Sequence, residues 1–383
     1  MTLRSRLKVG EATFSAEEHP CTRLALIILL CVSAMGIASC SANSFQADTV
    51  PTAFGRAYSI WQLPVSLYQL GFAGRYLIGQ NSQGRILAYK EGDGLPAWTR
   101  PTPGNDVSVF IQNNDVFEVG DNGSVVRLNP ATGRTMWISA PSAATYKRGP
   151  LVTLSVAHNL IAVGNDLLSL RSGAILQQFP LGANVEVAPS GLLIVQPSAA
   201  GTLSFDTLHS GKLHTEWTTH VSGMATVVGQ LASGELVVKY GYRLVMVDPA
   251  THLMTQLQTR GAVFHCIGAA LDEIIFRYRE RVVGINSSGR TQFTVKLPSG
   301  DIAVLRGSVT EPVLWGFQPL PQGLQPWTAV AWTLRPMKRI GELELNLSQA
   351  AALGDDPNLA YDRSYAAVGS PAGTLYVFRL SAR

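Results

Sequence analysis

Few residues in this chain of 383 residues have the types and spacing needed for catalysis. The sequence contains no G-x-S-x-G nucleophile motif, no H-E-x-x-H zinc motif and no P-loop. Four of the seven histidines fall in expected turns or strands without a partner pattern: His209, His214, His220 and His252. The acidic pair Asp355 and Asp356 is flanked by Gly and Pro, as in a solvated turn. We therefore predict that the protein is not an enzyme and holds no metal and no cofactor.

Cys40 has neighbours that suit a defined chemical modification. It follows Ile37, Ala38 and Ser39, and this order of an aliphatic residue, two small residues and a cysteine resembles the bacterial lipobox. The resemblance implies cleavage before Cys40 and attachment of diacylglycerol to its sulfur, because the small residues fit the peptidase and the thiol is the acceptor. An ordinary signal peptide or membrane anchor with an incidental cysteine remains the alternative.

The segment before Cys40 has the order of a secretory signal. Basic residues, among them Arg4 and Arg23, precede the uncharged apolar run Leu24–Ala38. A run of about 15 residues is short for a permanent membrane-spanning helix and fits the core of a signal peptide. The leader is long and contains Glu11 and Glu17, so we expect the true start codon to lie downstream of Met1.

The remaining cysteines predict no disulfide and no zinc site. Cys21 and Cys31 belong to the leader, so Cys266 is the only cysteine of the folded body apart from the lipid site. Cys266 lies in the apolar run Val263–Ala270, where a small buried hydrophobic role is expected. Histidine and cysteine clusters with the spacing of zinc ligands are absent from the sequence.

The composition favours an all-β protein. Only 15% of the residues are charged, 46% are hydrophobic, and the chain contains 36 glycines and 21 prolines. Few charges combined with many turn-forming residues suit many short strands around a sizeable core. The formal net charge of +4 is too small to argue for nucleic acid or an anionic surface as a partner.

A hairpin pattern recurs along the chain. Residues 122–137 read NGSVVRLNPATGRTMW, in which a turn at Asn129–Gly133 joins two strands and the second strand contains Trp137. Related segments are Gly84–Trp98, Asn165–Phe179, Gly201–Trp217, Tyr242–Leu257 and Glu280–Val295, with degenerate copies near Thr328–Leu345 and Gly373–Leu380. The turn glycines are Gly133, Gly173, Gly211 and Gly289, and His252 replaces the glycine of one copy. A spacing of about 36–48 residues is typical of a four-stranded propeller blade.

Large aromatic residues follow the turns: Trp98, Trp137, Phe179, Trp217 and Phe293, with Trp61 before the first copy. We expect these rings to dock across the gap between adjacent blades, which is a structural role and not a ligand site.

The ends of the chain are expected to complete an eight-bladed propeller. The segment Ala57–Pro64 supplies the outer strand of the last blade by pairing with Thr374–Leu380, which closes the ring. We expect the other strands of this blade at Ala350–Leu353 and Tyr365–Val368, although Ser348–Leu353 could also form one helical turn. The predicted divisions are a signal peptide at 1–39, the lipidated cysteine and a flexible tether at 40–56, and the propeller at 57–383.

At this point the sequence resembles a known family. The segments Asn129–Trp137 and, more weakly, His209–Trp217 are similar to the tryptophan-docking repeat of quinoprotein-like (PQQ-like) β-propellers. With a lipobox, a short tether and eight blades, the chain looks like the BamB family of the outer-membrane β-barrel assembly machinery. The resemblance implies a monomeric, non-catalytic scaffold on the periplasmic face of the outer membrane. Its partners would be envelope proteins, including a barrel-assembly subunit. Ser41 after the lipid site matches the pattern for outer-membrane sorting.

Two other functions remain open from the sequence. A propeller can bind a small ligand or a glycan at the mouth of its channel. Quinoprotein dehydrogenases share the fold and hold a quinone with Ca²⁺, but this sequence has no adjacent cysteine pair and no evident calcium loop. The dehydrogenase is therefore the weaker alternative.

Overall fold

The computed structural model describes fifteen stretches of the chain: residues 53–102, 107–112, 114–120, 123–139, 154–180, 182–197, 201–240, 243–257, 265–278, 280–297, 302–307, 312–317, 326–353, 357–371 and 373–380. The chain divides into two compact units, Met1–Ile37 and Ala38–Arg383, and all described residues belong to the second. The predicted signal peptide, the predicted lipid site Cys40, most of the predicted tether, Asp355 and Asp356 lie outside the described residues.

The described residues form eight blades of four strands. Blade 1 contains β2 (Tyr68–Ala73), β3 (Tyr76–Gln80), β4 (Arg85–Lys90) and β5 (Pro96–Pro101), and blade 2 contains β6 (Ser108–Gln112), β7 (Asp115–Val119), β8 (Val125–Leu128) and β9 (Thr135–Ser139). Blade 3 contains β10 (Leu154–Ala157), β11 (Leu160–Val163), β12 (Asp166–Ser169) and β13 (Ile175–Gln178), and blade 4 contains β14 (Asn184–Val187), β15 (Leu193–Gln196), β16 (Gly201–His209) and β17 (Lys212–Val221).

Blade 5 contains β18 (Ala225–Gln230), β19 (Leu236–Tyr240), β20 (Arg243–Val247) and β21 (Met254–Gln256), and blade 6 contains β22 (His265–Ala270), β23 (Glu273–Tyr278), β24 (Arg281–Asn286) and β25 (Thr291–Lys296). Blade 7 contains β26 (Ile302–Gly307), β27 (Pro312–Phe317), β28 (Trp327–Thr333) and β29 (Lys338–Leu345), and blade 8 contains β30 (Asn358–Tyr361), β31 (Tyr365–Gly369), β32 (Leu375–Arg379) and β1 (Gly55–Leu63).

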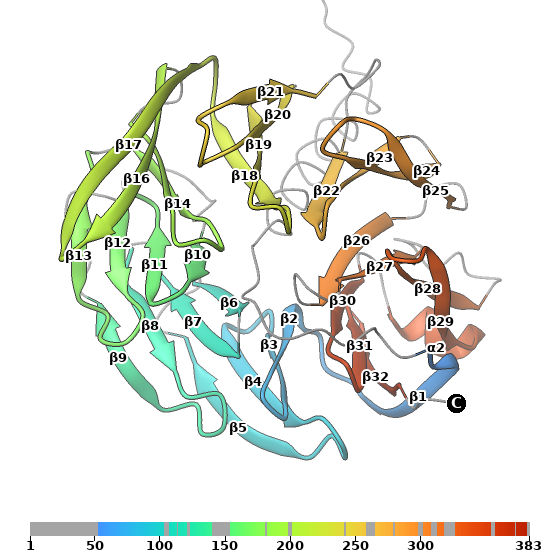
Figure 1. Cartoon of the computed structure of the whole chain (residues 1–383). Helices are drawn as coiled ribbons and strands as arrows, with labels where there is room; N and C mark the ends of the chain where they lie inside the picture. The colour runs from blue at the N-terminus through green and yellow to red at the C-terminus, as the bar shows by residue number, and fades with distance from the viewer. Residues whose placement is uncertain are drawn as a thin grey trace, which may run out of the picture. The chain divides into compact units, whose positions relative to one another are not determined.

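The blades follow one another around a ring, with the first strand of each blade innermost (Figure 1). Inner strands of successive blades lie in contact, as β2 does with β6, β18 with β22 and β26 with β30, and β2 also contacts β30, so the first blade meets the last. Cα partners in antiparallel register join the strands within each blade, for example Val116 with Leu128 between β7 and β8. The structure is therefore the all-β, eight-bladed propeller that the repeats predict.

Burial within a blade explains the strand sequences. The second strands are buried on both faces, so β3 reads YLIGQ and β15 reads LIVQ with almost no exposed residue. The outer strands alternate between partly buried and exposed positions, as in β5 and β9. A strand covered on both faces needs a continuous apolar run, whereas a strand at the periphery needs only one apolar face. Eight clusters of buried apolar side chains, all between Phe54 and Leu380, form the core.

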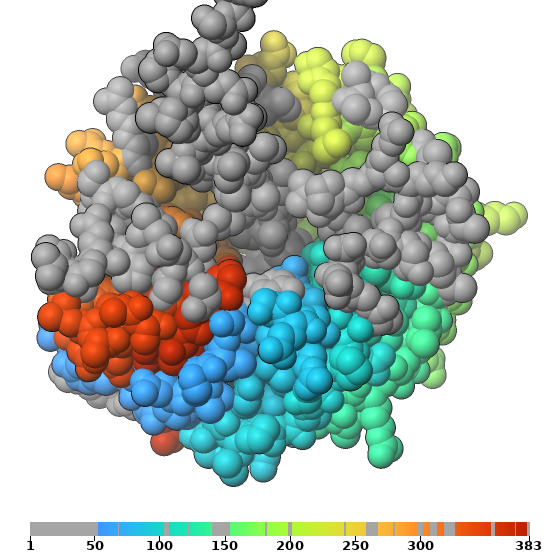
Figure 2. Space-filling model, turned by 180° about the vertical axis from the view of Figure 1, so that it is seen from behind, coloured from blue at the N-terminus to red at the C-terminus, as the bar shows by residue number. Residues whose placement is uncertain are grey.

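The predicted closure of the ring is confirmed. Strand β1 pairs antiparallel with β32, with Trp61 opposite Val377 and Leu63 opposite Leu375. The first half of β1 also pairs with β29 in parallel, from Gly55 opposite Gly341 to Tyr58 opposite Glu344. One N-terminal strand thus joins blades 7 and 8 into a single eight-stranded sheet. In Figure 2 the blue N-terminal surface lies beside the red C-terminal surface, as this pairing requires.

Two details differ from the sequence prediction. The strand expected at Ala350–Leu353 is wrong: these residues end the helix α2 (Leu347–Leu353), and the first strand of blade 8 is β30. Asn346 caps the helix, because its side-chain oxygen accepts the backbone N–H of Gln349 at 3.0 Å. Three alanines in the body of the helix add to its helical propensity. The propeller also begins before residue 57, since β1 starts at Gly55 and Phe54 is buried.

Among the described residues, no helix is long and apolar enough to cross a membrane.

Deletion of residues 373–383 removes β32 and leaves β1 and β31 without their partner, so we expect the cooperative unfolding transition of the whole ring to be lost. Thermal unfolding followed by circular dichroism measures this. Deletion of 381–383 alone keeps β32 and serves as the control, with an expected melting temperature equal to that of the intact chain. An unchanged melting temperature after the longer deletion would show that the ring is not closed by this pair.

Candidate functional site: the seams between blades and the outer rim

Tryptophans of three consecutive outer strands dock on the next blade. The indole N–H donates to a backbone carbonyl of the following hairpin turn: Trp61 to Glu91 at 3.0 Å, Trp98 to Pro130 at 2.8 Å and Trp137 to Leu170 at 3.0 Å. Each ring lies on the glycine of that turn, namely Gly94, Gly133 and Gly173. A Cβ atom at Gly133 would lie 2.6 Å from Cε3 of Trp98, so a side chain there would displace the ring.

The backbone places each tryptophan at a fixed distance from its own turn. In blades 1 and 2 the pairing of the third strand with the outer strand shifts register by one residue just before the tryptophan of the outer strand. On the third strand the shift lies between Ala88 and Tyr89 in blade 1 and between Arg127 and Leu128 in blade 2. Such a bulge turns the following side chain out of the regular alternation. Trp98 and Trp137 each follow the turn glycine by four residues.

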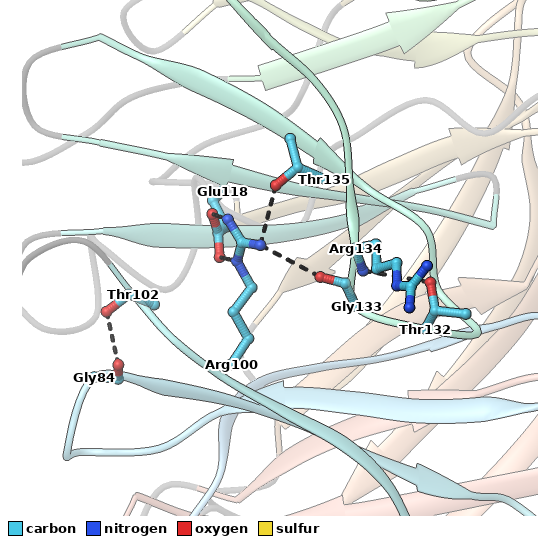
Figure 3. A network of polar contacts seen from close by, with 8 residues as sticks. All are labelled: Gly84, Arg100, Thr102, Glu118, Thr132, Gly133, Arg134 and Thr135. Atoms are coloured by element: carbon cyan, nitrogen blue, oxygen red, sulfur yellow. Dashed lines mark hydrogen bonds and ion pairs between the residues drawn. The ribbon is translucent and has the colours of Figure 1, made fainter.

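An ion pair reinforces the seam between blades 1 and 2 (Figure 3). Arg100 of β5 donates to both carboxylate oxygens of the buried Glu118 in β7, at 2.8 Å and 3.3 Å. The same guanidinium donates to Oγ1 of Thr135 at 3.0 Å and to the carbonyl of Gly133 at 3.4 Å. Burial raises the pKa of the Glu118 carboxyl, and the hydrogen bond from Arg100 opposes that rise. Trp98 and Arg100 therefore hold the same hairpin of blade 2 from one outer strand.

The seam between blades 4 and 5 uses different chemistry. The Trp217 ring stacks on Phe205, with centroids 3.9 Å apart, and on His252 of blade 5, with centroids 5.5 Å apart. His252 adopts a positive φ of 60°, so it takes the backbone conformation that glycine takes in the other turns. Among the described residues, the buried Nε1 of Trp217 has no hydrogen-bond acceptor. This seam keeps the stacking contact but lacks the indole hydrogen bond.

Phe179 packs between blades 3 and 4 at a position that differs from that of the tryptophans. Phe179 lies one residue beyond β13 and is buried in the core cluster that includes Val185 and Val195 of blade 4. The register shift of blade 3 puts Gln177 at the docking position, opposite Leu167. Phe179 was chosen because it is the large aromatic nearest the turn, but the spacing of four residues after Gly173 selects Gln177.

Phe293 occupies the docking position of blade 6 and packs in a cluster with Leu334 and Trp332 of blade 7. The four predicted turn glycines all have positive φ, at 65° for Gly133, 70° for Gly173 and 75° for both Gly211 and Gly289. Gly94, with a φ of 69°, belongs to the same set and was missed. The four-residue interval to Trp98 is the signal that could have identified it.

The inner strands are joined by side chains that accept backbone N–H groups of the next blade. Gln69 accepts from Val109 at 2.6 Å, Ser155 from Val187 at 2.9 Å, and Glu186 from Val227 at 2.8 Å. Glu186 is the only titratable acceptor of these three bridges. Burial raises its pKa to about 7, against the hydrogen bonds from Val227 and Asn184, which lower it. These residues carried no sequence signal because they belong to no motif.

The described residues show no cluster with the composition of a metal centre. No group of three or more His, Cys, Asp or Glu side chains among them could hold a metal ion. Cys266 lies in β22, within the apolar run that the sequence indicated. His209 and His214 lie with ring centroids 5.8 Å apart on the hairpin of blade 4, and His220 is exposed on β17.

Exposed apolar side chains gather on one part of the outer rim. Six of the nine large hydrophobic residues that the described chain exposes lie on or beside the outer strands of blades 8, 1, 2 and 3: Tyr58, Ile60, Leu95, Met136, Ile138 and Ile175. These strands follow one another along the outer margin of the ring (Figure 1). We refer to these six residues as the apolar rim. A concentration of exposed apolar residues on one edge is the usual sign of a contact surface.

Comparison with known proteins supports the fold. No family model and no curated protein match the chain. BamB from Moraxella catarrhalis matches it with a TM-score of 0.52 at 14% identity, over 84% of this chain and 99% of that chain. The computationally designed Ika8 protein matches with a TM-score of 0.63 at 11% identity, over 86% and 99%. The C-terminal WD40 domain of Sif2 matches with a TM-score of 0.62 at 10% identity, over 87% and 100%. At such identities the matches show a propeller fold.

We expect Trp98→Phe to destabilise the protein by about 1–2 kcal/mol, because the ring remains but the hydrogen bond to Pro130 is lost. Trp217→Phe should change the free energy of unfolding by less than about 0.5 kcal/mol or stabilise the fold, because it removes a buried donor that has no acceptor among the described residues. Urea unfolding of the two variants measures the difference. Equal losses would show that the indole hydrogen bond does not distinguish these seams.

Glu186→Gln should stabilise the protein increasingly as the pH rises. The Glu186 carboxyl has a pKa of about 7 in the folded state and about 4.3 in the unfolded state. It therefore stabilises the fold most below about pH 4.3, and this stabilisation is lost as the pH rises to about 7. The stability gained over the wild type should therefore grow to at most about 4 kcal/mol at pH 8. Ser155→Ala removes a non-titrating bridge and should cost the same at pH 5 and pH 8. A constant difference for Glu186→Gln would contradict the raised pKa.

Proposed function

We propose that this protein is a non-catalytic scaffold, anchored by lipid on Cys40 to the extracytoplasmic side of an envelope membrane, where it holds protein partners. In a cell with two membranes this would be the periplasmic face of the outer membrane. The proposal rests on the lipobox before the propeller and on the way the chain enters the ring. It requires no cofactor and no metal.

The observation that carries the proposal is the double role of β1. This strand closes the ring against β32, and it begins 15 residues after Cys40, counted from 40 to 55. A segment of 15 residues reaches at most about 50 Å when fully extended. A lipid on Cys40 would therefore hold the closing seam of the propeller near the membrane, and the loops on the far face of the ring would remain available for partners.

The finer part of the proposal is a BamB-like role. The tryptophan-docking repeat resembles that of quinoprotein-like propellers, and BamB from Moraxella catarrhalis is among the solved structures with the same fold. A barrel-assembly subunit is therefore the first partner to seek. No partner-binding residue is transferred, because the two chains share 14% identity.

The test is affinity purification of the tagged full chain from membranes after labelling with radioactive palmitate. We expect label on the wild type, together with envelope proteins that include a barrel-assembly subunit. Cys40→Ser should lose both the label and the partners. Cys31→Ser, which removes a cysteine from the apolar run of the leader, should keep both.

Label that persists in Cys40→Ser would overturn the anchor, and a labelled protein that purifies alone would overturn the scaffold. Addition of PQQ with Ca²⁺ to the purified protein should leave its melting temperature unchanged. A rise in melting temperature would favour the quinoprotein alternative over the non-catalytic role.

A further inference from the structure

We propose that the apolar rim, together with the cations beside it, rests on an anionic lipid surface, so that the propeller contacts the membrane directly as well as through Cys40. This inference rests on the proposed membrane location and adds the orientation of the ring. It commits to lipid as the occupant of the rim, and a protein partner or a second copy of the chain is an outcome that the test can reveal.

The outer hairpins of blades 2 and 3 each combine a cation with an exposed aliphatic side chain, and the hairpin of blade 1 has the same pair together with Glu91 and Asp93. Lys90 accompanies Leu95 in blade 1, Arg134 accompanies Met136 in blade 2, and Arg171 accompanies Ile175 in blade 3. Leu95, Met136 and Ile175 are 54%, 51% and 43% exposed. A surface that binds at the lipid interface combines aliphatic side chains, which enter the boundary of the acyl chains, with cations at the level of the headgroups.

The strand directions place these hairpins on one side of the ring. In each blade the turn between the first two strands and the turn between the last two lie at the same end, because the strands are antiparallel. In blade 1 the backbone N–H of Glu91 donates to the carbonyl of Arg75 at 3.2 Å, and in blade 3 that of Leu170 donates to Asn159 at 2.8 Å. We call this side the hairpin face.

The chain enters the ring on the hairpin face. Strand β1 is the outer strand of blade 8 and runs antiparallel to β32, so its first residue, Gly55, lies at the end where the other blades carry their outer hairpin turns. The described chain therefore begins on the same side of the ring as the cations of blades 1 to 3, although Gly55 itself lies opposite Gly341 of blade 7. Tyr58 and Ile60 of β1 are 60% and 45% exposed and continue the apolar rim to this entry point.

The other half of the ring has charged and polar residues without the apolar rim. Blade 4 exposes Lys212, His214 and Glu216 on its outer strand, and blade 6 exposes Arg290 and Lys296. On or directly beside the outer strands of blades 4 to 7, as far as the structure describes them, Leu253 is the single large exposed hydrophobic residue. Cations on both halves attract an anionic surface, and the apolar rim decides which edge inserts. The net charge of the chain gave no sign of this arrangement because it averages over the whole sequence.

Flotation with lipid vesicles tests the proposal. The chain from Ser41 to Arg383 lacks the lipid site and keeps every described strand and all eight core clusters, so any binding comes from the propeller surface. We expect it to float with vesicles of phosphatidylethanolamine and phosphatidylglycerol, to stay unbound with phosphatidylcholine, and to release at high salt. Met136→Ser with Ile138→Ser should weaken binding at least about tenfold.

The matched control is Met224→Ser with Leu253→Ser, which removes two equally exposed aliphatic side chains outside the rim and should bind as the wild type does. Absence of flotation, or an equal loss in the control, would overturn the proposal. A dimer in light scattering that the rim variant dissociates, without vesicle binding, would assign the rim to a second copy. Loss of a co-purified protein from the lipidated rim variant, without vesicle binding by the wild type, would assign it to that protein. In both cases the scaffold proposal would stand, because palmitate labelling and partner recovery are measured separately.

Discussion

A single propeller blade cannot cover its own two apolar faces, and this constraint governs the whole structure. Each second strand is buried on both sides, as β3 and β15 show, so each blade needs a neighbour on either side. A linear row of eight blades would leave two such faces in water. Pairing of β1 with β32, and of its first half with β29, removes those ends and joins blades 7 and 8 into one sheet.

The seams that complete the ring are not equivalent. The seams from blade 8 to blade 3 use an indole that lies on a glycine and donates to a turn carbonyl. The seam between blades 4 and 5 replaces the glycine by His252 and the neutral inner bridge by Glu186. The seam between blades 6 and 7 has Phe293, packed in an apolar cluster, in place of the tryptophan. It also has an ion pair in which Arg335 of blade 7 lies 3.1 Å from Glu273 of blade 6. These seams share only the packing of one four-stranded sheet against the next, and different side chains make the contacts in each.

Much of the fold could be predicted because the hairpin turn combines local signals. Asn129, Pro130 and Gly133 determine a tight turn, and Trp137 follows it at a fixed distance, so the repeat is visible within sixteen residues of sequence. Phe179 does not take the position of the tryptophans, because the spacing of four residues after Gly173 selects Gln177. The strand expected at Ala350–Leu353 failed because the side chain of Asn346 caps a helix at that point.

The features that could not be predicted depend on contacts between residues far apart in the chain. Gln69, Ser155 and Glu186 bind backbone groups 32 to 41 residues away, and no local pattern marks them. The apolar rim is likewise spread over four strands from Tyr58 to Ile175, and it becomes a surface only when the ring closes. Closure therefore links the stability of the fold to the assembly of the apolar rim.

Hydrogen exchange of the β1 amides tests this closure most directly. If β1 is an integral strand of the ring, those backbone N–H groups of Trp61–Leu63 that bond to β32 should exchange only through global unfolding, with the same protection and the same denaturant dependence as the amides of β8 in the middle of blade 2. Exchange of these amides at rates typical of a frayed terminus, while β8 remains protected, would show that the ring is held together without its N-terminal strand and would contradict the account.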